Sequence, residues 1–498
     1  MSDLLDSPRR CDQAFLMLDL RPIGYVIGLL TAVLGGLMLF PALVDHAARD
    51  ANWQVFLKSA AITTVVGVFL ALACAGVKGR GLDLRQSFVL TTGVWVVLPA
   101  FGAIPFMLGA PGASLTDAVF EAMSGITTTG ATVFTGLDDL SPGTNLWRVM
   151  LQWLGGLGIV IVALLFLPVM KVGGMQFFRA EGFDTLGKVL PRALDISAAL
   201  LQIYVVMTLA CAVVYWALGM TGFDAVIHAL STVSTGGFSN RDTSFDLYSD
   251  AMHYAAVVFM ILATLPFIRF IQAAQGNLRP LWRDVQVRAY LRWTLYAVLL
   301  TLGWRVAVGG EPFFHSIHDS VFMVVSIFTG TGLTSGSVTS WGQFPLMVLL
   351  IVGFIGGCTS STGCSVKVFR YLVVFAAIGA QIRRLLMPYS VQPIRLGGRT
   401  VEQEVITSVM VFFTMFILSF GVLAVLLSLT GLAPLTALTA AWTAIADIGP
   451  VYGEGVGATG AIGGFPDAAK WLMIAGMMLG RLELLSVYVL FTARFWNH

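Results

Sequence analysis

Hydroxyl residues and glycines recur together in four short stretches of a chain that is otherwise strongly apolar. In each stretch, Ser or Thr stands six positions before a glycine, and an apolar residue or Pro follows that glycine. The four pairs are Ser124 and Gly130, Ser231 and Gly237, Ser326 and Gly332, and Thr443 and Gly449. Backbone carbonyls and hydroxyls can replace the water around an alkali-metal ion, and glycine permits the backbone angles that turn carbonyls toward it. One such loop resembles an ordinary glycine break between membrane helices, but four in the same register predict a site for a dehydrated cation.

The residues before each glycine predict the helix that positions the loop. Three copies carry Ser or Thr sixteen residues before the glycine and Asp thirteen residues before it: Ser114 and Asp117, Thr221 and Asp224, Ser316 and Asp319. This spacing is a helix-start signature, which the fourth copy, with Ala433 and Thr436, lacks. Each copy therefore predicts a helix of about three turns that ends in the loop. Four such helices aimed at one axis bring the negative ends of their dipoles together, which favours a cation.

The composition indicates a membrane protein. The chain is 57% hydrophobic and only 11% charged over 498 residues, whereas a soluble domain carries roughly 25% charged residues. No stretch has the composition of a soluble domain. Ten apolar segments of about 20 residues are long enough to cross a bilayer; they lie near residues 23–45, 53–77, 87–109, 145–170, 194–220, 251–276, 288–310, 344–375, 402–431 and 468–495.

The four loops divide these segments in a regular way. Two leading segments precede four units of helix, pore loop and helix, and internal repeats of this kind build a site on their common axis. The predicted fold is an all-α polytopic membrane protein with two N-terminal helices and four pseudo-repeats around a central pore. The predicted boundaries are 1–22 for a tail, 23–80 for the leading helices, and 87–170, 194–276, 288–380 and 402–498 for the repeats.

Lys and Arg gather at one end of the segments, and short cytoplasmic loops carry such an excess. This side holds Arg9, Arg10, Arg21, Lys78, Arg80, Arg85 and the stretches 171–192, 279–292 and 367–399, whereas the other side has few, such as Arg49, Arg148, Arg241 and Lys470. Both termini are therefore predicted to be cytoplasmic, with all four pore loops entering from outside. Residues 1–22 contain no apolar run of signal-peptide form and predict a cytoplasmic tail.

Two further features lie in the predicted spans. Gly356–Gly363 interrupts the eighth segment with a run too polar for a lipid-facing helix, and irregular backbone at membrane depth is tolerated only where protein buries it or water lines it. A kink at a helix end is the alternative interpretation. Arg481 lies about 20 Å along the last segment at helical rise, where a charge marks a functional interior position. Glu483 is a candidate partner, although residues two apart on a helix face different ways.

Other motifs do not form a site. The five cysteines, at positions 11, 74, 211, 358 and 364, show neither metal-ligand spacing nor a disulfide framework and are expected to be free thiols. His315, His318 and Asp319 resemble a metal-ligand cluster but do not complete a ligand set. Gly455–Gly460 matches a dinucleotide fingerprint without the strand and helix that it needs. The spans lack convergent catalytic residues and paired broken helices in two inverted halves, so neither an enzyme nor an organic-solute carrier is predicted.

Six motifs together resemble the TrkH proteins of the Trk/Ktr/HKT potassium-uptake superfamily, over nearly the whole chain. They lie at Thr127–Thr132, Gln152–Ile159, Gly173–Glu181, Ser234–Ser239, Ser361–Lys367 and Met478–Glu483. The resemblance implies K⁺ uptake across the bacterial inner membrane through a selective gated pore, driven by the membrane potential, with coupling to H⁺ or Na⁺ left open. It also implies a homodimer and a cytosolic ring of nucleotide-binding, TrkA-like regulatory subunits, docked on the basic loops 171–192, 279–292 and 370–399. The surroundings are the lipid bilayer, and neither nucleic acid nor an organic cofactor is expected.

The resemblance also assigns site residues. K⁺ is expected to bind to backbone carbonyls of a filter formed by Thr127, Thr128, Thr129 and Gly130; Ser234, Thr235, Gly236 and Gly237; Thr329, Gly330, Thr331 and Gly332; and Ala446, Asp447, Ile448 and Gly449. The gate is expected to consist of Gly356, Gly357, Cys358, Thr359, Ser360, Ser361, Thr362, Gly363, Lys367 and Arg481.

Two positions depart from the family pattern. Asp447 stands where the family commonly has Asn, and Cys364 and Ser365 end a run whose third glycine is missing here. An ionised Asp447 near the ion path would change affinity or cation preference. The alternative function is a Na⁺ transporter or Na⁺/K⁺ symporter of the same fold. Plant relatives that carry Na⁺ have Ser in place of the first filter glycine, so Gly130 argues against this alternative.

Overall fold

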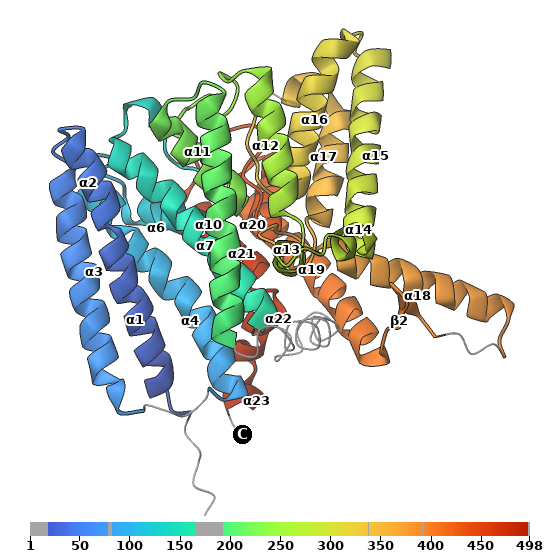
Figure 1. Cartoon of the computed structure of the whole chain (residues 1–498), viewed down its shortest axis with the longest axis horizontal. Helices are drawn as coiled ribbons and strands as arrows, with labels where there is room; N and C mark the ends of the chain where they lie inside the picture. The colour runs from blue at the N-terminus through green and yellow to red at the C-terminus, as the bar shows by residue number, and fades with distance from the viewer. Residues whose placement is uncertain (1–17, 78–81, 166–192, 337, 390–392, 497–498) are drawn as a thin grey trace, which may run out of the picture.

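The computed structural model describes residues 18–77, 82–165, 193–336, 338–389 and 393–496. These residues form helices and loops with one small antiparallel hairpin, β1 (Arg395–Leu396) and β2 (Arg399–Thr400). The start of α1 and the end of α23 lie at the same end of the molecule (Figure 1). Most of the predicted tail 1–22, Cys11, the motif Gly173–Glu181 and the basic stretch 171–192 lie outside the described residues.

The N-terminal helices pack closely because small residues line their contact. They are α1 (Arg21–Leu37), α2 (Leu39–Ala47) and α3 (Trp53–Ala73), followed by the short η1 (Ala75–Val77). A Cβ atom added at Gly28 would lie 2.5 Å from the backbone N of Ala71, and one added at Gly67 would lie 2.4 Å from that of Ala32. Without a hydrophobic driving force between helices in lipid, such close backbone packing supplies much of the association energy.

Each of the four following units contains an outer helix, a short pore helix and a return helix. The first unit consists of α4 (Leu84–Gly102) with α5 (Ile104–Leu108), the pore helix α6 (Leu115–Ile126), η2 (Leu137–Asp139) and α7 (Pro142–Leu165). The second consists of α10 (Ala193–Ala217), the pore helix α11 (Gly222–Ser234) and α12 (Asp250–Ala263) with α13 (Phe267–Ala274).

The third unit consists of α14 (Arg279–Arg283), α15 (Val285–Ala307), the pore helix α16 (Phe313–Thr329), η4 (Val338–Trp341), α17 (Gln343–Ile355) and α18 (Val368–Leu386). The fourth consists of α19 (Gln403–Leu429), the pore helix α20 (Pro434–Ala446), α21 (Asp467–Arg481), α22 (Leu485–Tyr488), η5 (Val489–Phe491) and α23 (Ala493–Trp496).

Three of the ten predicted spans are broken. Within the described chain, six stretches are long and apolar enough to cross a membrane, and two bent pairs raise the number to eight. The pairs replace the predicted straight segments 251–276 and 468–495: α12 and α13 meet at 94°, and α21 meets the α22–η5 stretch at 106°. Pro266 ends the first helix because its ring cannot continue the hydrogen-bond ladder. At the second break, Glu483 and Leu484 take positive φ angles of 61° and 50°.

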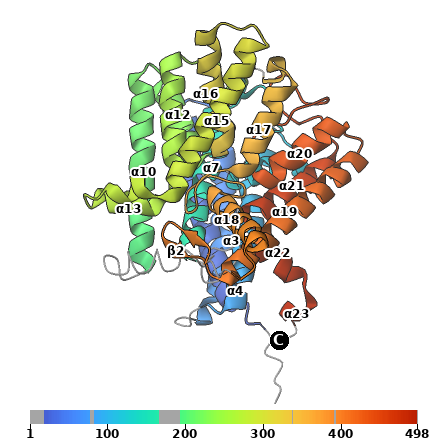
Figure 2. The same cartoon turned by 90° about the vertical axis from the view of Figure 1, so that its right-hand side faces the viewer.

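The third break lies in the predicted segment 344–375. α17 ends at Ile355, residues 356–367 form no helix, and α18 then leaves the bundle sideways (Figure 1) and points toward the viewer in Figure 2. The interruption predicted at Gly356–Gly363 is confirmed. The break is larger than a helix kink, because twelve consecutive residues are irregular.

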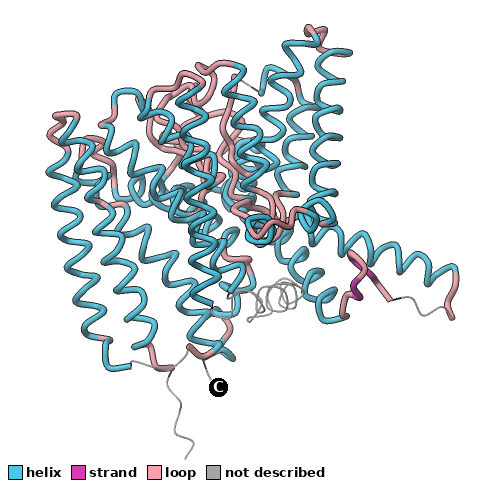
Figure 3. The backbone as a smooth tube through the Cα atoms, viewed as in Figure 1, coloured by secondary structure: helices cyan, strands magenta, loops and turns pink. Residues whose placement is uncertain are grey.

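The pore helices lie in the protein interior and the outer helices face its surroundings. The second half of each of the four pore helices is almost completely buried. In contrast, α3, α10 and α19 expose large apolar side chains, among them Phe69, Leu209 and Val425. Loops run from the upper surface down into the centre of the molecule (Figure 3). An apolar exterior around a polar, loop-lined centre is the arrangement of a protein that lets a polar solute pass through lipid.

Candidate functional site

The four loops predicted from the glycine register meet in a closed ring. A Cβ atom added at Gly130 would lie 2.1 Å from the carbonyl O of Gly236, and one added at Gly237 would lie 2.0 Å from that of Thr331. The ring continues from Gly332, where an added Cβ would lie 2.8 Å from the backbone N of Gly449. It closes because a Cβ at Gly449 would lie 3.2 Å from the carbonyl O of Gly130. Each loop is therefore in contact with the next, and a side chain at the first two glycines would displace its neighbour.

A shared backbone conformation accompanies the ring. The residue two positions before the glycine has a positive φ in all four loops: 57° at Thr128, 54° at Thr235, 81° at Gly330 and 53° at Asp447. Three of these are not glycine, and a side chain in the left-handed region costs energy that persists only where the surroundings enforce it. The same strained angle at four equivalent positions supports the interpretation of the loops as one functional structure.

The recurring six-residue spacing between the hydroxyl and the glycine has a structural explanation in three of the four loops. Ser124 Oγ donates to the carbonyl of Ala131 at 2.5 Å, Ser326 Oγ to that of Leu333 at 2.6 Å, and Thr443 Oγ1 to that of Pro450 at 2.7 Å. Each bond ties the end of a pore helix to the residue after the glycine. These hydroxyls therefore hold the loop in shape.

The second loop uses a different brace, which sequence reasoning missed. Gln152 of α7 donates from Nε2 to the carbonyl of Gly236 at 2.5 Å and accepts from the backbone N of Phe238 at 3.1 Å. Ser231 Oγ has no hydrogen-bond partner among the described residues. A polar amide in the middle of the apolar helix α7 was the available sequence signal.

Several filter carbonyls remain free to bind an ion. In the first loop, the carbonyls of Thr128, Thr129 and Gly130 accept no hydrogen bond from any described residue, and the hydroxyls of Thr127 and Thr129 bond to one another at 2.8 Å. The same holds in the third loop for the carbonyls of Gly330, Thr331 and Gly332. Because buried carbonyls are nearly always paired in proteins, unpaired carbonyls on two opposite sides of the ring mark a place for a ligand with positive charge.

The pore helices confirm two of the three predicted caps. Ser114 Oγ accepts from the backbone N of Asp117 at 3.1 Å at the start of α6, and Thr221 Oγ1 accepts from that of Asp224 at 3.1 Å at the start of α11. The prediction is wrong for the third copy. α16 begins at Phe313, one turn earlier, because Pro312 supplies the fixed φ of a helix start, so Ser316 lies inside the helix.

Asp447 joins the fourth loop to the first. Thr129 Oγ1 donates to Asp447 Oδ1 at 3.0 Å, and the aspartate is 1% exposed. Its Oδ2 faces α21, since a Cβ atom added at Gly480 would lie 3.0 Å from it. The carboxylate is therefore fixed behind the ring, next to the residue that precedes Arg481.

The interrupting loop Gly356–Gly363, with the residues up to Lys367, lies against the filter. Ser365 Oγ donates to the carbonyl of Ala446 at 3.3 Å, and a Cβ added at Gly330 would lie 3.4 Å from the backbone N of Cys364. Cys364 Sγ is also 3.5 Å from Thr128 Oγ1. The loop thus touches the first, third and fourth of the four glycine loops.

The other side of this loop is held by the break between α12 and α13. The backbone N of Cys358 donates to the carbonyl of Thr264 at 3.0 Å, and that of Phe267 donates to the carbonyl of Ser360 at 2.9 Å. Thr362 Oγ1 donates to the carbonyl of Ala263 at 2.9 Å. At the bend around Pro266, backbone groups of Ala263, Thr264 and Phe267 are therefore free to form hydrogen bonds with the loop. The break between α12 and α13 thus holds the loop in place.

Arg481 ends α21 and reaches the same loop. Its Nη1 lies 2.6 Å from Cys364 Sγ and 3.5 Å from the carbonyl O of Thr362, and the residue is 4% exposed. The Nε and Nη2 atoms have no hydrogen-bond partner among the described residues. Glu483, the candidate partner, pairs instead with Arg370 of α18. Arg481 is therefore a buried charge with spare donors beside the filter and the loop.

Charged residues assigned to the two surfaces from the sequence are partly buried. Lys367 and Arg370 lie inside the protein beside Arg481 and Glu483, not in a cytoplasmic loop. Arg148 is also buried, where Nε donates to Glu121 Oε1 at 2.7 Å and Nη1 to the carbonyl of Ser239 at 2.9 Å. Its position links the first loop to the second.

The loops that follow the first and second filter segments are joined by acidic residues. Asp138 accepts from Arg241 Nη1 at 2.9 Å and from the backbone N of Asp242 at 3.1 Å, while Asp242 accepts from the backbone N atoms of Gly136 and Leu137 at 3.0 Å. Burial alone would raise the pKa of Asp138, but these hydrogen bonds outweigh it and hold the pKa below its usual value. The carboxylate of Asp138 therefore stays ionised, and its ion pair with Arg241 is retained, well into the acid range.

The comparison with known proteins agrees with this geometry. Residues 52–497 match the family model TrkH, described as a cation transport protein. The chain is 39% identical over 478 residues to the Trk system potassium uptake protein TrkI of Halomonas elongata, covering 96% of this chain and 97% of that protein. It is 35% identical over 484 residues to the Trk system potassium uptake protein TrkH of Escherichia coli K12, covering 96% and 99%.

A solved structure confirms the predicted fold class. The crystal structure of the potassium transporter TrkH from Vibrio parahaemolyticus superposes with a TM-score of 0.89 at 33% identity, covering 96% of this chain and 100% of that one. Sequence, fold and the ring of four loops lead to the same assignment, and this chain belongs to the TrkH family of cation transport proteins.

Proposed function

We propose that this chain carries K⁺ into the bacterial cell through the ring of four loops. The supporting observation is the closed contact between Gly130, Gly237, Gly332 and Gly449, together with the unpaired carbonyls of the first and third loops. Carbonyl oxygens on several sides of a narrow ring replace the water of an alkali-metal ion. The names of the relatives as potassium uptake proteins support K⁺ as the ion.

The filter of this proposal consists of Thr127–Gly130, Ser234–Gly237, Thr329–Gly332 and Ala446–Gly449. K⁺ is the cargo, and its ligands are backbone carbonyls, because those of the first and third loops accept no hydrogen bond from any described residue. The chain needs no organic cofactor and catalyses no covalent reaction. A membrane potential supplies about 2.3 kcal/mol per charge per 100 mV, which is enough to concentrate K⁺ without a second ion.

The gate of this proposal is the loop Gly356–Gly363 with Lys367 and Arg481. The contacts of the adjoining Cys364 and Ser365 with three filter segments, and those of the loop itself with the broken helix α12–α13, support this role. Glycines give the loop alternative backbone states at low cost, and the fixed charge of Arg481 prevents a K⁺ ion from resting beneath the ring. Movement of α12 against the filter would open or close the path.

The chain is proposed to lie in the inner membrane with both termini in the cytoplasm and the filter loops entering from outside. Two copies form a dimer in which each keeps its own pore, and a cytosolic ring of nucleotide-binding subunits docks on the basic surface. The end of the molecule that holds both α1 and α23 supports a common side for the termini (Figure 1).

The decisive experiment is rescue of a potassium-uptake-deficient bacterium at low K⁺, combined with fluxes of K⁺, Rb⁺, Na⁺ and H⁺ in proteoliposomes. Rescue together with K⁺ and Rb⁺ flux that exceeds Na⁺ flux supports the proposal. Equal or larger Na⁺ flux would replace it by the Na⁺ transporter of the same fold. A proton or Na⁺ flux that depends on K⁺ would show symport.

A further inference from the structure

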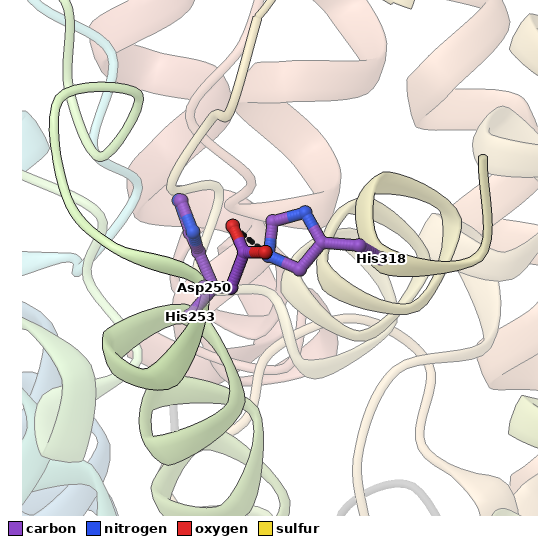
Figure 4. A group of neighbouring side chains, drawn as sticks. All are labelled: Asp250, His253 and His318. Atoms are coloured by element: carbon purple, nitrogen blue, oxygen red, sulfur yellow. Dashed lines mark ion pairs between the residues drawn. The ribbon is translucent and has the colours of Figure 1, made fainter. Parts of the chain in front are cut away.

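A group of three potential metal ligands lies apart from the filter and the gate. Asp250 and His253 on the first turn of α12 face His318 of α16, and one ligand atom from each lies within 4.8 Å of the others (Figure 4). The sequence suggested a different group, His315 with His318 and Asp319. In the structure, Asp319 Oδ2 lies 3.2 Å from Arg305 Nη2 and 3.7 Å from Nε2 of the exposed His315, so that carboxylate is paired with Arg305.

The hydrogen bonds of the two imidazoles fix which nitrogens can bind a metal. Nε2 of His253 lies 3.0 Å from the carbonyl O of Phe245, so it carries the proton and leaves a lone pair on Nδ1. Nδ1 of His318 lies 3.2 Å from Asp319 Oδ1, which leaves the lone pair on Nε2. Both of these lone-pair nitrogens are buried and have no hydrogen-bond partner among the described residues. Histidines that bind metals typically donate their other N–H to a carbonyl or carboxylate in this way.

The third ligand is accessible from solution. Asp250 Oδ1 lies 3.6 Å from Nε2 of His318, and the aspartate side chain is 82% exposed, whereas His253 is only 4% exposed. An ion from solution can therefore reach the exposed carboxylate of Asp250 and then bind the two buried imidazole nitrogens. In a tetrahedral zinc site with bonds of about 2.0–2.1 Å, ligand atoms are about 3.5 Å apart, so the group must contract by about an ångström, which rotation of Asp250 can supply in part.

We propose that Asp250, His253 and His318 bind a divalent transition-metal ion of the zinc class. Two imidazoles and one carboxylate are a ligand set of this class, and the fourth position remains open for water. Alkali-metal ions prefer oxygen ligands, so the site is distinct from the path of the transported ion. The inference does not depend on which ion the pore carries.

The site would tie together two elements that matter for transport. α16 ends in the third filter loop, and α12 ends at the bend that holds the loop Gly356–Gly363. A metal that joins His253 to His318 restrains α12 against α16 at the end opposite this bend. Because the ligands come from different repeats, binding should stabilise the packing of the second repeat against the third.

The test uses the full-length purified chain, freed of any affinity tag, and two probes: Zn²⁺ by calorimetry and Co²⁺ by its visible absorption. The variants are His253→Gln, which keeps a donor to Phe245, and His318→Asn, which keeps a donor to Asp319. His315→Gln, on the same helix but outside the group, is the matched control. Thermal unfolding with and without Zn²⁺ provides a second measurement and shows that each variant is folded.

We expect one Zn²⁺ per chain, a tetrahedral Co²⁺ spectrum and a Zn²⁺-dependent rise in Tm for the wild type and for His315→Gln. Each ligand variant should lose at least the roughly 10- to 100-fold in affinity that even an outer-shell change costs, and its Tm should no longer respond to Zn²⁺. Wild-type protein that binds no Zn²⁺ would overturn the proposal. So would folded ligand variants that bind it as tightly as the control.

Discussion

Glu483 forms its buried ion pair with Arg370 of α18 and not with Arg481, which is only two residues away. The break between α21 and α22 makes this possible, because Glu483 itself takes a left-handed backbone angle. Arg370 also lies 3.8 Å from the centre of the Phe412 ring, so the pair is packed into the base of the fourth repeat. Glu483 therefore has a structural role, whereas the hydrogen-bond contacts of Arg481 are with Thr362 and Cys364.

Arg481→Ala is expected to fold and to change K⁺ transport. In contrast, Glu483→Ala leaves Arg370 as an uncompensated buried charge, which costs about 3–5 kcal/mol, so this variant should show a much lower Tm. Flux in proteoliposomes and thermal unfolding separate the two effects. An Arg481→Ala protein that does not fold, beside a stable Glu483→Ala protein, would reverse the two assignments.

Gly130→Ser and Gly237→Ser are expected to weaken the preference for K⁺ over Na⁺. An added Cβ at either position meets a carbonyl of the next loop near 2 Å, and a side chain at such a φ costs about 1–3 kcal/mol. The ratio of K⁺ to Na⁺ flux should therefore fall on the order of tenfold. Gly158→Ser in α7 is the matched control, since no atom lies within 4 Å of its added Cβ. Unchanged flux ratios in both filter variants would exclude the ring as the selectivity filter.

The sequence shows the filter because the filter is local. A hydroxyl six residues before a glycine reflects one hydrogen bond that spans one turn of loop, as between Ser124 and Ala131. A local sequence signature fails to predict the start of a helix where another residue nearby also starts one. Pro312 starts α16 before the Ser316 signature can cap it, and the length of that pore helix was therefore underestimated.

Long-range pairing explains what sequence reasoning could not predict. Leu265-Pro266 carries a visible break signal, but neither Glu483 nor Leu484 disfavours a helix strongly. The 106° bend there accompanies the contact of Glu483 with Arg370, which is distant in the sequence. Gln152 and Arg148 were visible as polar residues in an apolar helix, yet each bonds to a backbone carbonyl of another repeat, Gly236 for Gln152 and Ser239 for Arg148. The family resemblance supplied the role of Arg481, and the structure adds its contact with Cys364.

Asp447→Asn tests the most unusual residue of the filter. Asn keeps an acceptor for the Thr129 hydroxyl and has nearly the same shape, so the Tm should change little. The substitution removes an ionisable group that lies behind the ring, and the apparent affinity for K⁺ and the K⁺ to Na⁺ flux ratio should shift. Asp139→Asn, outside the ring, serves as the control. Identical K⁺ affinity and selectivity in the Asp447→Asn protein would show that this carboxylate does not act on the ion path.

Deleting Thr359, Ser360 and Ser361 is expected to raise K⁺ flux in the absence of any regulatory partner. The deletion removes the bond from Phe267 to Ser360, which ties the loop to the bend after α12. A control deletion of three residues in the exposed loop around Gly455 should leave flux unchanged. Flux at or below the wild-type level in a correctly folded deletion protein would favour a purely structural loop.

The basic surface for the regulatory ring is expected to be the outer part of α18 and the α14 region. Arg370, which began the predicted stretch 370–399, is buried and excluded from this surface. α18 instead projects from the bundle (Figure 1) and carries Arg383 and Arg384 beside the exposed Leu385 and Leu386.

Reversal of Arg383 and Arg384 to Glu should abolish co-purification with the nucleotide-binding subunit and leave the Tm unchanged. The matched control is Arg49→Glu, at the opposite end of the leading helices, where a charge reversal should not affect binding. Because exposed charges contribute little to stability, a loss of binding in the α18 variant would reflect the interface and not the fold. Undisturbed binding in that variant would restrict these arginines to setting the orientation of the chain in the membrane.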